Sequence, residues 1–119
     1  MMLLLFVVSI IGLQAANSPA QFVWEGEVDG TVVLHARANR LKVDTVSGQP
    51  VVKQRFKFYE RLPDSRRQVR LEVLENRGAV WISQQPTLQN DYTLSVTIED
   101  RQDGRAFYSI RLYWDKRAP

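Results

Sequence analysis

The chain has 119 residues, enough for one domain of ordinary size, and carries 16 basic and 13 acidic side chains for a formal net charge of +3. It contains no cysteine, which excludes a disulfide framework, a thiolate metal site and a cysteine nucleophile. The basic excess is small and mixed with acidic residues, so no nucleic-acid partner is expected.

The first 20 residues are expected to act as a signal peptide. Residues 3–13 form an apolar run that small residues follow, a pattern typical of secretory signals, although no Lys or Arg precedes the run. The run is about half the ~20 apolar residues that a membrane-spanning helix needs. Cleavage is expected near one of three alanines, Ala15, Ala16 or Ala20. We therefore predict a secreted or periplasmic protein, in a bacterial envelope, with no transmembrane segment in the mature chain.

Residues 21–119 are expected to form a single β domain. The stretch 92–99 alternates Leu94, Val96 and Ile98 with polar residues, which is the pattern of a half-buried strand. Similar alternation elsewhere predicts about eight short strands, and no window shows the 3.6-residue period of a helix. The expected strands are 22–27, 31–38, 41–46, 52–59, 69–75, 79–84, 92–99 and 106–114. Short strands at this spacing favour an all-β antiparallel β-sandwich.

The number and spacing of these strands resemble immunoglobulin-like or fibronectin-like sandwiches in general architecture. The cysteine pair and the tryptophan spacing of true immunoglobulin domains are missing, so the resemblance is one of strand count. Such a fold does not imply a function.

Three tripeptides that end in glycine, at 28–30, 76–78 and 102–104, predict three-residue hairpin loops. At 28–30, this loop sends Trp24 and Leu34 into the core and leaves Glu25, Glu27 and His35 outside. A two-residue turn would instead bury both glutamates without partners.

The loop at 102–104 predicts a hairpin of the last two strands, with Ile98 beside Tyr108 and Val96 beside Ile110. At 76–78, a three-residue loop places Trp81 in the core, whereas an even-numbered loop places its two neighbours, Val80 and Ile82, there instead. Analogy with the other two loops favours a buried Trp81.

Residues that could perform catalysis are scarce. His35 is the only histidine, no serine has a nucleophile signature, and each carboxylate cluster lies on a predicted solvent face or turn. No metal-ligand spacing and no phosphate-binding glycine loop occurs, so no metal and no cofactor is expected. We interpret His35 as a surface residue and expect no enzymatic activity, with a small hydrolase as the least favoured alternative.

One surface is a candidate for ligand binding. In the predicted last hairpin, hydroxyls of one strand face aromatic rings and a guanidinium of the other, which together could hold a sugar chain or a peptide. The candidate residues are Ser95, Phe107, Arg111 and Tyr113, with Trp81 or Trp24 as further aromatic contacts. We predict an exported, non-enzymatic binding or protein-interaction module whose partner is an envelope or extracellular protein or a polysaccharide. The alternative is a carbohydrate-binding accessory domain that uses these aromatic residues.

Overall fold

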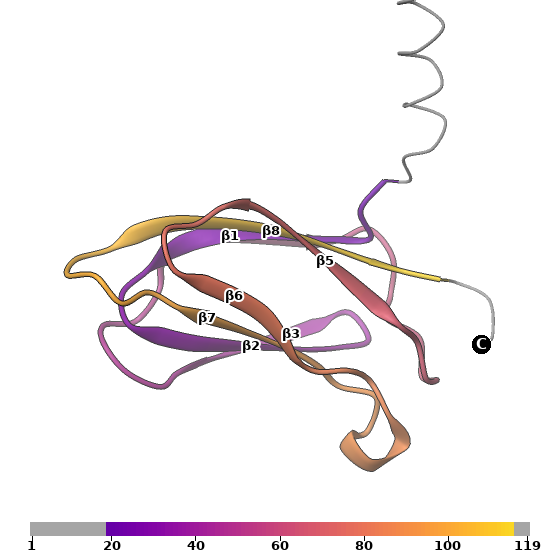
Figure 1. Cartoon of the computed structure of the whole chain (residues 1–119). Helices are drawn as coiled ribbons and strands as arrows, with labels where there is room; N and C mark the ends of the chain where they lie inside the picture. The colour runs from indigo at the N-terminus through magenta and orange to yellow at the C-terminus, as the bar shows by residue number, and fades with distance from the viewer. Residues whose placement is uncertain (1–18, 116–119) are drawn as a thin grey trace, which may run out of the picture.

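A computed structural model of the chain describes residues 19–115, which form two four-stranded antiparallel sheets packed face to face (Figure 1). Sheet A has the order β4 (Val52–Phe58), β1 (Phe22–Val28), β8 (Ala106–Trp114) and β5 (Val69–Glu75). Sheet B has the order β3 (Arg40–Thr45), β2 (Thr31–Arg37), β7 (Leu94–Glu99) and β6 (Ala79–Gln84). A 3₁₀ turn, η1 (Leu88–Asn90), is the remaining element. The prediction of an all-β, two-sheet domain of about eight strands is confirmed.

The predicted signal peptide lies almost entirely outside the described residues. Within residues 19–115, no helix has the length and apolar character needed to cross a membrane.

The core lies between the two sheets and follows from the period-2 alternation of the strands. In β1 and β8 every second residue is buried, so each strand contributes one apolar row to the interior. The largest fully buried side chains include Phe22, Trp24, Leu34, Leu94, Ile98, Tyr108, Ile110 and Leu112. The predicted inward positions of Trp24, Leu34 and Tyr108 are therefore confirmed.

The three predicted hairpins are wrong, because in each of them the two strands lie in different sheets. β1 pairs with β4 and β8, whereas β2 pairs with β3 and β7. Likewise β5 pairs with β8 while β6 pairs with β7, so β7 and β8 are not neighbours. The glycine-closed segments are arches, by which we mean connections that pass from one sheet to the other. At 28–30 and 102–104 the arch buries the same side chains as a three-residue hairpin would, so the alternation could not distinguish them.

The burial of Trp81 is also predicted wrongly. Trp81 is 41% exposed and lies opposite Thr97 on the outer side of sheet B. Its neighbours Val80 and Ile82 pack against the core instead. The three-residue hairpin assumed for 76–78 does not form, so the register taken from it does not apply.

An ion pair between half-buried Arg77 and buried Asp100 joins two of the arches. The Arg77 guanidinium donates to both oxygens of Asp100, at 2.7 and 2.9 Å, and to the carbonyls of Asp103 and Gly104 at 2.9 Å each. The Asp100 side chain is fully buried and also accepts the Tyr108 hydroxyl at 2.7 Å. These contacts satisfy a carboxylate that would otherwise destabilise the fold.

Candidate functional site

The structure separates the candidate ligand-binding residues onto two opposite faces. Phe107, Arg111 and Tyr113 alternate with buried residues of β8 and therefore lie on the outer face of sheet A. Ser95 and Trp81 lie on the outer face of sheet B. The predicted ledge of hydroxyls and aromatic rings does not exist, since it required β7 and β8 to pair. Trp24 is fully buried and is not available to a ligand.

On the outer face of sheet B, polar side chains form a hydrogen-bonded chain that the sequence did not predict. Ser95 Oγ lies 2.8 Å from His35 Nδ1, and Asp44 Oδ2 lies 2.9 Å from His35 Nε2. His35 stands directly opposite Ser95 on the central pair β2 and β7, and β3 brings Asp44 alongside. His35 is therefore a bonded member of a network and not an isolated surface residue.

This chain has the groups of a serine hydrolase triad but lacks the surroundings that make the hydroxyl a nucleophile. Ser95 is only 3% exposed, so a substrate carbonyl cannot reach its oxygen from solvent. An oxyanion hole needs free N–H donors beside the nucleophile, whereas β7 is a central strand that pairs with β2 and β6 on its two sides. A role in orienting side chains across sheet B fits this geometry better than acyl transfer.

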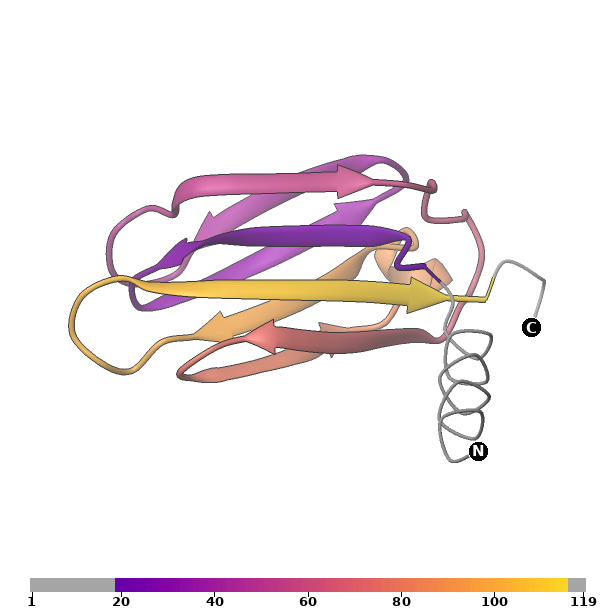
Figure 2. The ribbon, with the colours of Figure 1, turned by 90° about the horizontal axis from the view of Figure 1, so that it is seen from above.

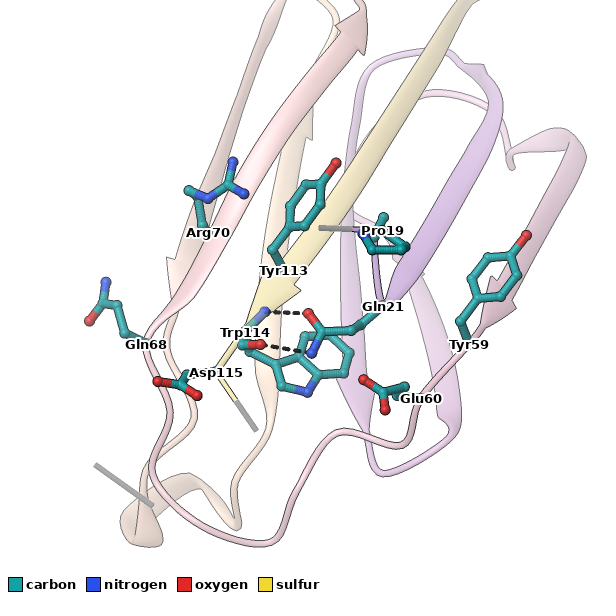
Figure 3. A pocket seen from close by; sticks show the side chains of 10 residues that line it. Pro19, Gln21, Tyr59, Glu60, Gln68, Arg70, Tyr113, Trp114 and Asp115 are labelled. Atoms are coloured by element: carbon teal, nitrogen blue, oxygen red, sulfur yellow. Dashed lines mark hydrogen bonds between the residues drawn. The ribbon is translucent and has the colours of Figure 1, made fainter. Parts of the chain in front are cut away.

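The outer face of sheet A contains a hollow at one end. It has a volume of about 720 Å³ and lies at the end of the sheet where β1 begins and β8 ends. Figure 3 shows Tyr113 and Arg70 on one side, Tyr59 and Glu60 on the other, and Gln21 and Trp114 between them. The Gln21 amide and the Trp114 backbone exchange two hydrogen bonds, of 2.7 and 2.6 Å, which hold the two strand ends together.

The rings on both sides of this hollow are held next to cations. The Arg70 guanidinium lies 4.2 Å from the centre of the Tyr113 ring, and the Lys57 ammonium lies 4.7 Å from the centre of the Tyr59 ring. The Tyr113 hydroxyl donates to Glu72 at 2.7 Å. Partial burial, and then this bond to Glu72, raise the pKa of Tyr113 above its ordinary value. The Tyr113 ring is therefore fixed, whereas Tyr59 is 58% exposed.

A second, smaller hollow of about 480 Å³ follows the middle of the same face. Arg111 and Ser109 of β8, Arg55 of β4 and Leu74 of β5 line it, and Tyr59 borders both hollows. Tyr113 and Arg111 thus line a continuous surface, to which Phe107 does not contribute.

Sequence reasoning missed Tyr59, Arg70 and the Gln21–Trp114 pair. Tyr59 is the last residue of the predicted strand 52–59, and a signal for it was the aromatic series Phe56, Phe58 and Tyr59. Nothing in the sequence brings Arg70 beside Tyr113, because the pairing of β5 with β8 joins segments about 40 residues apart.

Within residues 19–115, no cluster of three or more histidine or carboxylate side chains could hold a metal ion. Comparisons of the chain with protein-family models, with curated proteins and with solved structures find no match. Its function is therefore inferred from its own geometry.

Proposed function

We propose that this protein is an exported, non-enzymatic binding module that engages a partner protein of the envelope or extracellular space through the outer face of sheet A. The observation that carries the proposal is the pair of hollows that meet at Tyr59 on this face. They combine exposed aromatic area with fixed cations, the composition found at recognition surfaces.

The contrast between the two faces supports this choice. On sheet B the polar groups bond to one another, as in the pairs His35–Ser95 and Thr97–Ser83. On sheet A, Tyr113 bonds to Glu72, but Tyr59 is largely open to solvent, and no ion pair to Arg55 or Arg111 is found among the described residues. The likeness to immunoglobulin-like domains adds nothing here, since β1 and β2 lie in different sheets.

The test compares one exposed aromatic residue on each face. The exported protein is immobilised and used to recover a specific partner from the envelope fraction of the organism that encodes it. Tyr59→Ala should reduce recovery of that partner about tenfold, as expected for truncation of an aromatic contact residue. Trp81→Ala removes a similarly exposed ring from sheet B and should leave recovery unchanged. Equal effects of the two substitutions would contradict the proposal.

Carbohydrate binding is the second candidate, and the two tyrosine rings at the end hollow favour it. Sugar rings stack on aromatic planes, while Gln68, Arg70 and Glu60 supply polar groups around the same hollow. Titration with soluble polysaccharides should then change tyrosine or tryptophan emission. Tyr113→Phe keeps the ring and should bind nearly normally, whereas Tyr113→Ala should bind about tenfold more weakly. No emission change with any polysaccharide would exclude this candidate.

Export is part of the proposal and is tested separately. Mass spectrometry of the protein recovered outside the cytoplasm should find the chain beginning after Ala15, Ala16 or Ala20. Recovery of a chain that still starts at Met1, and only from the cytoplasm, would contradict it.

A further inference from the structure

We propose that β4 is a docking edge that accepts an extended acidic segment of a partner protein as an additional strand of sheet A. The inference deepens the proposed function and rests on it, because it names the partner chemistry for the same face. β4 forms one edge of sheet A, and within residues 19–115 no strand lies on its outer side (Figure 2).

The direction of the β4 backbone groups follows from one hydrogen bond. The Tyr59 N–H donates to the Gln21 carbonyl at 2.8 Å, so the backbone groups of Tyr59 face β1. Because orientation alternates along an antiparallel strand, Arg55 and Lys57 also face β1. The N–H and C=O groups of Gln54, Phe56 and Phe58 therefore point away from the sheet, where an added strand can pair with them.

The side chains at this edge are apolar on one side and cationic on the other. Phe56 is 46% exposed although it packs in a cluster with Phe22 and Phe58, with ring centres 4.4 to 6.3 Å apart. Arg55 and Lys57 alternate with these rings and lie on the outer face. An added strand that alternates apolar and acidic residues would place its apolar side chains against Phe56 and Phe58 and its carboxylates beside the cations.

Positive charge exceeds negative charge along β4. The cations of this strand are Lys53, Arg55 and Lys57. Lys53 has an ion-pair partner, Glu27 at 3.3 Å, and Arg55 stands opposite Glu25 of β1. Arg40 and Lys42 of β3, the edge strand of sheet B on the same side (Figure 2), lie on the outer face of sheet B and do not add to this surface. Three cations against two carboxylates leave the edge with a positive excess that selects an acidic partner.

The same cations argue against a second copy of this chain as the occupant. In an antiparallel pair of β4 strands centred on Phe56, Arg55 of one copy stands opposite Lys57 of the other. Like charges directly opposite each other destabilise a strand pair, and edge lysines commonly prevent such self-pairing.

The start of β4 limits the length of the docking edge. Lys53 has a positive φ of 56°, and the register of β4 with β1 shifts there, so the docking edge comprises residues 54–58.

The test uses a blocked seven-residue peptide of alternating glutamate and valine, with a lysine–valine peptide as its control. The glutamate peptide should bind the protein, and binding should weaken with added salt. Amide hydrogen exchange should slow at Gln54, Phe56 and Phe58, whereas Arg55 and Lys57 are already paired with β1. Binding without this protection would overturn strand addition, and so would an absence of binding.

A second experiment reverses the charge of the two outer-face cations of β4. The double variant R55E/K57E should bind the glutamate peptide about tenfold more weakly and should gain affinity for the lysine peptide. R101E reverses an exposed cation outside this edge and should change neither affinity. An unchanged preference in R55E/K57E would overturn the inference. A natural partner that is lost in Tyr59→Ala but retained in R55E/K57E would also overturn it, and would leave the proposed function standing.

Discussion

At the scale of single residues, the structure assigns partners to side chains that the sequence could only place on a face. His35 was correctly expected on the outer side of its strand, yet its bonds to Ser95 and Asp44 were not foreseen. Asp44 comes from the strand that follows β2 after a two-residue turn, so its proximity could have been inferred from local register. Ser95 arrives through the pairing of β2 with β7, which nothing local determines.

The alkaline pH dependence of stability should identify the Tyr108–Asp100 bond. Burial, together with the bond to Asp100, raises the pKa of Tyr108 to about 12 from an ordinary value of 10.0. The neutral hydroxyl is favoured in the folded state, so its contribution is complete below pH 10 and is lost as the pH rises to about 12. Tyr108→Phe should lower the free energy of unfolding by about 2 kcal/mol at pH 8. It should also flatten the decline between pH 10 and 12 in urea titrations, and an equally steep decline would contradict this assignment.

The same network should also make the stability of the fold depend on pH in acid, through Asp100. The Arg77 bond, and then the Tyr108 bond, lower the pKa of Asp100 below its ordinary 3.8. The stabilising contribution of this carboxylate is therefore present above pH 3.8 and is lost as the pH falls below it. Asp100→Asn should reduce stability at pH 7 and lose less stability between pH 5 and 2 than the unsubstituted protein does. Parallel pH profiles of the two proteins would contradict this prediction.

The exposure of Trp81 can be checked by fluorescence quenching. Trp24 and Trp114 are buried, whereas Trp81 projects from sheet B. Iodide should therefore quench one component of the tryptophan emission, and Trp81→Phe should remove that component. Quenching that persists in Trp81→Phe would place Trp81 in the core, as the hairpin interpretation had it.

At the scale of the elements, the pairing of strands is the main difference between expectation and structure. At 28–30 and 102–104, both the arch and the hairpin reverse the chain at a glycine and bury the same alternate residues. They differ in whether the two strands bond to each other or face each other across the core. That choice depends on long-range pairs such as β1 with β8 and β2 with β7.

Engineered disulfides can distinguish the two pairings, because the chain has no cysteine of its own. Glu25 and Ser109 are directly opposite on β1 and β8, so Glu25→Cys with Ser109→Cys should oxidise to a disulfide. The hairpin expectation pairs Thr97 with Ser109, which in the structure lie on opposite faces of the sandwich. Thr97→Cys with Ser109→Cys should stay reduced within the monomer. Thiol counting and mass spectrometry measure both results. A disulfide in the Thr97/Ser109 pair and none in the Glu25/Ser109 pair would support the hairpin pairing instead.

At the scale of the whole molecule, one connection joins the two edges of sheet A. The segment between β4 and β5 crosses one end of the sandwich (Figure 2), where Leu62 is buried and its N–H donates to the Ala38 carbonyl at 3.0 Å. The same segment begins with Tyr59 and Glu60, which line the end hollow. Folding of the core and placement of the candidate site therefore both depend on the segment between β4 and β5.

Leu62→Ala should test this dependence. Loss of a fully buried leucine should lower the free energy of unfolding by about 2–5 kcal/mol. Leu88 in η1 is exposed, so Leu88→Ala should change it by less than about 0.5 kcal/mol. Chemical denaturation measures both, and equal effects would mean that the crossing segment does not close the core.

The sequence by itself determined the all-β class, the approximate strand positions and most of the inward-facing residues, because a period of two is a local property of a strand. It also predicted that Tyr113 and Arg111 lie on an outer face. Only the tertiary structure decided which strands are neighbours, and with them the hollow around Tyr59, the Ser95–His35–Asp44 chain and the exposed edge of β4. Strand neighbours are set by contacts between distant segments, and alternation leaves the same pattern whichever of those contacts forms.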